Sequence, residues 1–207
     1  MKKITVFLPV FCFAIFICFQ ATAQKLPARW DEITASDWNN ALTQSNKTCI
    51  LPIGILEKHG PHVPIGSDLI RVREYALRAT KKEYAVVFPD YFYGQINEAK
   101  HQPGVFALPE RTVWDLLENT CDEIARNGFN KIIIVNGHGG NPELIKYFIQ
   151  TRLEKKEITQ YIFSSRHQIP HTINNWPPYD IPIPQAISML AKEKHRKFCI
   201  SVPSWYN

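Results

Sequence analysis

The chain has 207 residues and a net charge of +5, and 45% of its residues are hydrophobic and 21% charged. This composition is typical of globular proteins and excludes the disordered, collagenous and disulfide-scaffold classes. The positive charge is too small to indicate a nucleic-acid partner. A chain of this length is expected to form one domain.

The first 23 residues resemble an export signal. Residues 1–3 form a short basic start, residues 4–19 are nearly all apolar, and residues 21–23 (ATA) supply the small side chains of a cleavage site. The alternative is an uncleaved membrane anchor, but the apolar stretch is shorter than the roughly 20 residues that a spanning helix needs. We therefore expect a periplasmic or secreted protein, with a mature domain at residues 24–207 and no membrane span after cleavage.

The cysteines agree with export without indicating disulfides. A lipoprotein signal would use Cys18, but the bulky Ile17 precedes it where such signals place a small residue. After cleavage an odd number of cysteines remains, Cys49, Cys121 and Cys199, widely spread and without a CxxC pair. They are expected to be buried small hydrophobic residues.

From residue 24 onward, short apolar runs alternate with longer amphipathic stretches, which predicts an α/β domain with a largely parallel sheet. The expected strands are 48–53, 85–88, 131–135 and 160–164. The expected helices are 37–43 capped by Ser36, 67 or 68 to about 82, 110–126 closed by Asn127-Gly128, and 142 to about 155 capped by Asn141. Between them, residues 91–107 should form a long irregular loop, and a short helix is expected at 185–194.

The first segment with candidate functional residues follows the expected strand 48–53 and reads GILEKHGPHVPIGSD. Glu57 and His59 are two residues apart, so in an extended segment their side chains point to the same side and can bind one cation. Asp68 follows near the start of a helix. Two carboxylates and an imidazole form a ligand set suited to Zn or Mn, and a carboxylate can bridge two ions.

The second segment, NGHGGN, follows the strong strand 131–135. It places His138 at a strand-to-helix turn among glycines, which allow a ligand to approach the backbone closely. The helix N-terminus that follows offers N–H groups to an anion or oxyanion. Both segments lie past the carboxyl ends of parallel strands, where open α/β sheets bind ligands.

Each segment alone has a less specific interpretation. Pairs such as Glu57 and His59 are common on solvated loops, and NGHGGN could be a phosphate-binding turn of a nucleotide-binding module, although it lacks the GxGxxG spacing and the P-loop lysine. His62 fits a structural role better than a ligand role. His101, His167, His171 and His195 have no spacing that singles them out.

The two segments together resemble the creatininase (creatinine amidohydrolase) family, whose signatures read approximately GSxEQHGPHLPLxTD and NGHGGN. The likeness covers about residues 27–150 and includes the HQPGVFALPER stretch between the motifs. The resemblance implies a three-layer α/β amidohydrolase with a dinuclear centre of Zn, Mn or Fe. Carried over by motif, Glu57 and His138 would bind one ion and His59 the other, with Asp68 between them.

The resemblance also implies hydrolysis of a C–N amide bond, other than a peptide bond, by metal-activated water. The expected substrate is a small amide such as a creatinine-like cyclic amide or a formamide, and the expected assembly is a homo-oligomer. Two departures motivate an alternative. Gly140 stands where creatinine hydrolases have a glutamate ligand, and the chain has no HAGxxE segment, so the tail from about residue 165 is divergent or truncated. The alternative is a catalytically impaired member that retains ligand or single-metal binding.

Overall fold

The computed structural model describes residues 26–154, 159–165 and 199–202. The expected signal at residues 1–23 and the expected helix at 185–194 lie outside these ranges. The helices are η1 (Trp30–Glu32), α1 (Trp38–Gln44), α2 (Ser67–Thr80), η2 (Asn97–Ala99), α3 (Glu110–Arg126) and α4 (Pro142–Thr151), where η marks short 3-10 helices. The strands are β1 (Thr48–Ile53), β2 (Val86–Val87), β3 (Lys131–Asn136), β4 (Gln160–Ser165) and β5 (Cys199–Val202).

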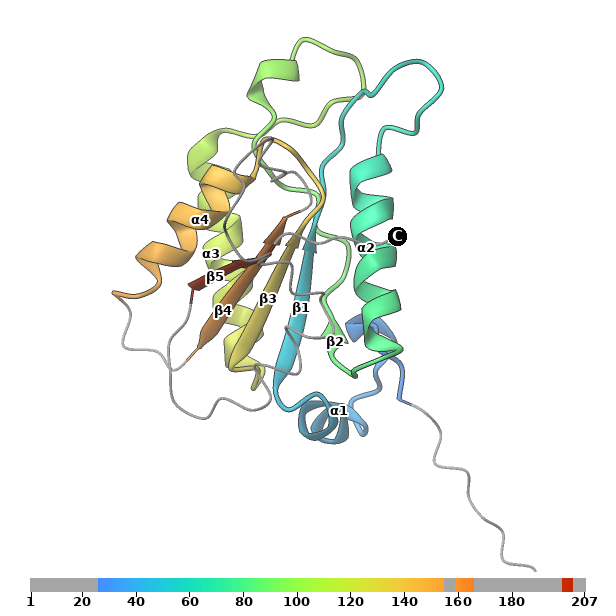
Figure 1. Ribbon diagram of the computed structural model, residues 1–207, viewed down its shortest axis with the longest axis vertical. Helices are drawn as coiled ribbons and strands as arrows, with labels where there is room; N and C mark the ends of the chain where they lie inside the picture. The colour runs from blue at the N-terminus through green and yellow to red at the C-terminus, as the bar shows by residue number, and fades with distance from the viewer. Residues whose placement is uncertain (1–25, 155–158, 166–198, 203–207) are drawn as a thin grey trace, which may run out of the picture.

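The strands form one sheet in the order β2-β1-β3-β4-β5, and every neighbouring pair is parallel (Figure 1). β1 and β3 pair over their whole length and are buried at every position. Strands of a parallel sheet that are covered on both faces appear in sequence as continuous apolar runs, which explains why both could be predicted. The expected α/β fold with a largely parallel sheet is confirmed.

Helices cover both faces of this sheet, which gives three layers (Figure 1). On one face, α2 packs Val72 and Ala76 against Ile50, Ile133 and neighbouring strand residues. On the other face lie α3 and α4. The core there combines the alternate strand residues with helix side chains, among them Cys49, Leu51, Ile132, Ile134, Leu117, Cys121, Ile124, Ile145 and Phe148. The strands therefore divide their side chains between two apolar cores.

The connections that leave β1 and β3 diverge to opposite faces of the sheet. β1 is followed by α2 on one face, whereas β3 is followed by α4 on the other, although β1 and β3 are neighbours (Figure 1). Such a switch in direction opens a crevice at the carboxyl ends of the two strands. Both predicted chemical segments begin at this crevice.

Several predicted boundaries differ from the structure. α1 begins at Trp38, and Asp37 rather than Ser36 occupies its N-cap position, because Thr34 turns the preceding chain by hydrogen bonding to Asp37. β2 is shorter than predicted, and the 91–107 loop contains η2. α4 ends at Thr151 instead of about residue 155. β5 was not predicted.

The two cysteines within residues 26–154 behave as the sequence predicted. Cys49 and Cys121 are free thiols, both fully buried in the core under α3. Burial in apolar surroundings raises the pKa of the Cys49 thiol well above its usual value, so this group is unreactive. Within the described part of the chain, no helix has both the length and the hydropathy needed to span a bilayer.

Candidate metal centre

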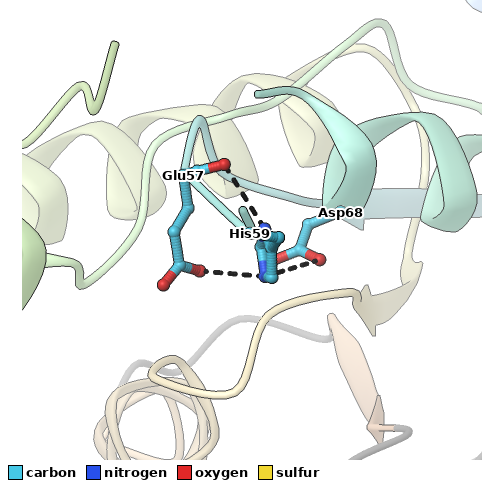
Figure 2. A group of neighbouring side chains, drawn as sticks. All are labelled: Glu57, His59 and Asp68. Carbon is cyan, nitrogen blue, oxygen red and sulfur yellow. Dashed lines mark hydrogen bonds and ion pairs between the residues drawn. The ribbon is translucent and has the colours of Figure 1, made fainter. Parts of the chain in front are cut away.

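Glu57 and His59 lie on the loop that leaves β1, and this loop folds back on itself before α2. The Glu57 backbone N–H donates to the carbonyl of Ile65 (2.9 Å), which turns the segment so that its two polar side chains meet Asp68 at the start of α2. Ligand atoms of Glu57, His59 and Asp68 all lie within 4.8 Å of one another (Figure 2). His59 Nε2 is 3.3 Å from Glu57 Oε2 and 3.8 Å from Asp68 Oδ1.

Asp68 is the most buried member of this group, with 2% of its surface exposed. Its two oxygens face different partners. Oδ1 accepts a hydrogen bond from Arg71 Nη2 (2.6 Å) and faces His59, whereas Oδ2 lies 3.2 Å from His138 Nδ1. Burial by itself raises the pKa of Asp68, but the hydrogen bonds to His138 and Arg71 outweigh it and lower the pKa overall. The carboxylate is therefore ionised, and one of its oxygens faces His59 while the other faces His138.

His138 follows β3 and is also buried. Its Nε2 is 2.9 Å from the carbonyl oxygen of Gln95, which can only accept, so this nitrogen carries the hydrogen. The other nitrogen, Nδ1, lies 3.2 Å from both Glu57 Oε2 and Asp68 Oδ2. Two carboxylate oxygens and a ring nitrogen this close together require a shared proton or cation between them. A backbone carbonyl that fixes the far nitrogen is the usual support of a metal-binding histidine.

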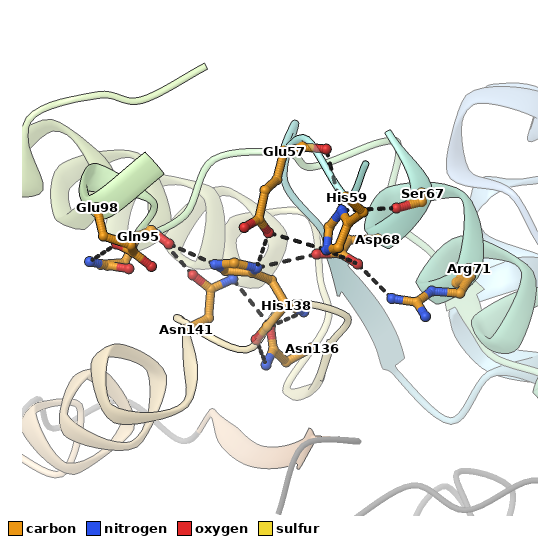
Figure 3. Close-up of polar contacts among 10 residues, drawn as sticks. All are labelled: Glu57, His59, Ser67, Asp68, Arg71, Gln95, Glu98, Asn136, His138 and Asn141. Carbon is orange, nitrogen blue, oxygen red and sulfur yellow. Dashed lines mark hydrogen bonds and ion pairs between the residues drawn. The ribbon is translucent and has the colours of Figure 1, made fainter. Parts of the chain in front are cut away.

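The two asparagines of NGHGGN hold this histidine and the 91–107 loop in place (Figure 3). Asn136 binds both sides of the His138 backbone: Oδ1 accepts from the N–H (3.1 Å) and Nδ2 donates to the carbonyl (2.6 Å). Asn141 Nδ2 donates to Asn136 Oδ1 (3.1 Å), and Asn141 Oδ1 accepts from the Gln95 N–H (2.8 Å). Asn141 occupies the N-cap position of α4 as predicted, but its side chain makes no capping bond because it binds Asn136 and the Gln95 N–H instead.

A cavity of about 420 Å³ contains these groups. Its lining residues are Glu57, His59, Asp68, Arg71, Glu98, His138, Gly139 and Gly140. All four predicted ligands therefore line one cavity. Within the described residues, His62 and His101 are exposed and do not line it, whereas His167, His171 and His195, which no spacing singled out, lie outside those residues.

Arg71 and Glu98 were not predicted from the sequence. Arg71 lies one helical turn after Asp68, a spacing that could have indicated it. Glu98 belongs to η2 and accepts a hydrogen bond from Gln95 Nε2 (2.9 Å). Hydrogen bonds from its own backbone N–H and then from Gln95 lower the pKa of Glu98, so it is anionic at neutral pH. Its place in a loop without periodicity left no sequence signal.

Gly140 has no room for a side chain. A Cβ there would lie 2.6 Å from both Gln95 Oε1 and His138 Nε2, far inside normal contact distance. The glutamate that creatinine hydrolases carry at this position therefore does not fit this arrangement. The Gln95 side chain and backbone occupy the space instead.

The creatininase family model, described as creatinine amidohydrolase, matches residues 31–194. The chain belongs to the creatininase family. A crystal structure of creatinine amidohydrolase (creatininase) superposes with a TM-score of 0.60 at 23% identity, covering 67% of this chain and 57% of that one. A structure described as creatininase Mn gives 0.60 at 23% identity, covering 67% and 58%. These likenesses confirm the creatininase fold.

Three curated relatives show the range of creatininase-family activities. Creatinine amidohydrolase of Pseudomonas putida is 27% identical over 55% of this chain and 46% of its own length. Mycofactocin precursor peptide peptidase of Mycolicibacterium smegmatis is 30% identical over 46% of this chain and 41% of its own. A 2-amino-5-formylamino-6-ribosylaminopyrimidin-4(3H)-one 5'-monophosphate deformylase of Methanothermus fervidus is 36% identical over 47% and 40%. The chain thus matches less than half the length of each.

Proposed function

We propose that this protein is a metal-dependent amidohydrolase that hydrolyses a C–N amide bond of a small molecule. The main support for this proposal is that two carboxylates and two imidazoles line one cavity at the carboxyl ends of β1 and β3. These side chains belong to Glu57, Asp68, His59 and His138. The cavity volume suits a small substrate. Family membership supports the same function and gives no support to the nucleotide-binding alternative.

The donor set fits a divalent ion. Glu57, Asp68 and His138 present two carboxylate oxygens to one ring nitrogen at 3.2 Å, and they would hold the first ion. His59 lies 3.8 Å from the other oxygen of Asp68, and these two residues would hold a second ion. Carboxylate and imidazole ligands suit Zn, Mn and Fe. Solved creatininases include a mutant of Zn–Zn type and a Mn form, which supports this choice.

A bound divalent ion would supply a nucleophile from water near neutral pH and polarise the amide carbonyl. The chain itself contributes orientation and charge. Gln95 fixes the ring of His138 through its carbonyl, and Asn141 fixes Gln95. Gly139 and Gly140 bring the start of α4 to the cavity, where a helix N-terminus favours a developing negative charge.

Metal analysis of the purified protein tests this proposal. We expect Zn, Mn or Fe to bind after reconstitution and His138→Ala to abolish binding, because this change removes a buried nitrogen that faces both carboxylates. The matched control is His101→Ala, an exposed histidine outside the cavity lining. Wild-type protein that takes up no metal would refute the proposal. Metal-loaded protein that hydrolyses neither creatinine nor any formamide or linear amide would favour the impaired alternative.

We also propose that the protein is exported and assembles as a homo-oligomer. Export rests on the composition of residues 1–23. Expression with the native N-terminus should yield a mature protein that begins at Gln24 outside the cytoplasm, and retention of Met1 would contradict this. The oligomer rests on the family resemblance, and light scattering that gives a monomer mass would contradict it.

A further inference from the structure

Two opposite charges line the cavity in addition to the four ligand candidates. Arg71 lies on α2 and Glu98 on η2, and in Figure 3 they stand at opposite ends of the site with Glu57, His138 and Asp68 between them. The proposed function does not use either charge.

Arg71 can bind an anion. Its side chain is 45% exposed, and Asp68 Oδ1 accepts one of its five N–H donors. The neighbouring α2 arginines differ, because Arg73 pairs with Asp90 and Arg78 with Glu74, away from the cavity. A guanidinium with exposed N–H groups matches a carboxylate in charge and in geometry.

Glu98 can bind a cation. Gln95 Nε2 holds one of its oxygens, and Gln95 is itself held through its backbone by Asn141, so the carboxylate is positioned by the network that also orients His138. An ionised, exposed carboxylate in this position complements an ammonium or amidinium group.

We infer that the substrate is a short amide with a cationic group on one side of the scissile bond and a carboxylate on the other, bound by Glu98 and Arg71 respectively. The inference rests on the proposed function, since the amide must lie at the ligand residues between these charges. A dipeptide with free termini has this order of groups. The substrate class is then wider than the non-peptide amides expected from the sequence.

Four matched ligands test the inference by calorimetry on Zn-loaded protein. Glycylglycine carries both charges, N-acetylglycine only the carboxylate, glycine N-methylamide only the ammonium, and N-methylacetamide neither. We expect each charge to improve the dissociation constant about tenfold, as a charge-assisted contact does. Affinities within about threefold of one another for all four ligands would overturn the inference.

Two variants assign each charge to its residue. Arg71→Gln should remove the preference for the carboxylate and leave that for the ammonium, and Glu98→Gln should do the reverse. Arg73→Gln and Glu74→Gln, on the same helix but outside the cavity lining, should change neither. Variants that weaken all four ligands equally would overturn the assignment. Metal content and hydrolysis are measured separately, so loss of the proposed function is distinguished from loss of charge selection.

Discussion

Replacing Asn141 with alanine should destabilise the protein and weaken its metal site together. The Asn141 side chain is buried, with 1% exposure, and it bonds to the Gln95 N–H at 2.8 Å and to Asn136 Oδ1 at 3.1 Å. Each of the two lost hydrogen bonds costs about 1–1.5 kcal/mol, because the half-buried Gln95 N–H loses its side-chain partner and Asn136 Oδ1 loses one donor while it keeps the His138 N–H, so the variant should lose about 2–3 kcal/mol. In a domain of this size that lowers Tm by about 5–10 °C.

The same substitution should also lower the affinity for metal, because Asn141 holds the loop that positions His138. Without Asn141, the backbone of Gln95 loses its anchor, and the carbonyl of Gln95 no longer holds His138 Nε2 in position. Loss of such support costs metal affinity about 10–100-fold in known sites. Urea denaturation of the metal-free protein gives the stability change, and titration with Zn in a competing chelator gives the affinity.

The matched control for this prediction is Asn119→Ala. Asn119 is exposed on α3 and donates to the Asp115 carbonyl one turn before it, so we expect a change within about 0.5 kcal/mol. A loss below about 0.5 kcal/mol for Asn141→Ala would refute the reasoning. So would an unchanged Zn affinity, since the histidine would then not depend on the loop.

Three further changes test other parts of the structure. Gly54→Ala should cost at least about 3 kcal/mol in urea denaturation, because its Cβ would lie 2.3 Å from Leu69 Cα in the α2 backbone. A chelator should lower Tm, since Zn at 100 times its dissociation constant adds about 2.7 kcal/mol, and His138→Ala should remove this response. Arg152→Ala should cost about 2–3 kcal/mol, because Asp122 and Glu118 lose their buried guanidinium partner, and both carboxylates are partly exposed, which keeps the cost below that of breaking a fully buried ion pair.

The outcomes of these changes are distinct. Gly66→Ala is the control for the first, since the nearest atom to its Cβ is 3.7 Å away, and equal stability of the two variants would refute the close approach at Gly54. A Tm that does not respond to chelation would contradict the metal site. Arg111→Ala, an exposed ion pair, should be within about 0.5 kcal/mol of wild type, and an equally small loss for Arg152→Ala would show that burial adds nothing.

The fold could be predicted where local pattern and burial agree. Residues 48–53 and 110–126 were predicted with the bounds of β1 and α3, because a covered parallel strand is continuously apolar and α3 has a clear buried stripe. β5 was missed because the four residues 199–202 are too short to show a period. Its pairing with β4 is a tertiary contact that no local pattern records.

The residues of the site could be predicted where they belong to sequence motifs. They could not be predicted where they lie in the irregular 91–107 loop. Glu57 and His138 were identified from GILEKHGPHVPIGSD and NGHGGN, and the structure brings both to one cavity. Gln95 acts through its backbone carbonyl, which has no residue-specific signal. Asn141 was assigned to a helix cap because that is its common role at such a position, but the bond to Gln95 depends on how the loop folds.

The position of the site across β1 and β3 has a kinetic consequence. α2, β2 and α3 lie between these two strands in the sequence, and pairing over such a separation is a slow step of folding. Glu57 and His138 meet only after that pairing, so an unfolded chain does not present the complete ligand set. A bound ion would then slow unfolding without accelerating folding, because its contacts form after the transition state. The ion would lengthen the lifetime of the folded sheet without guiding its formation.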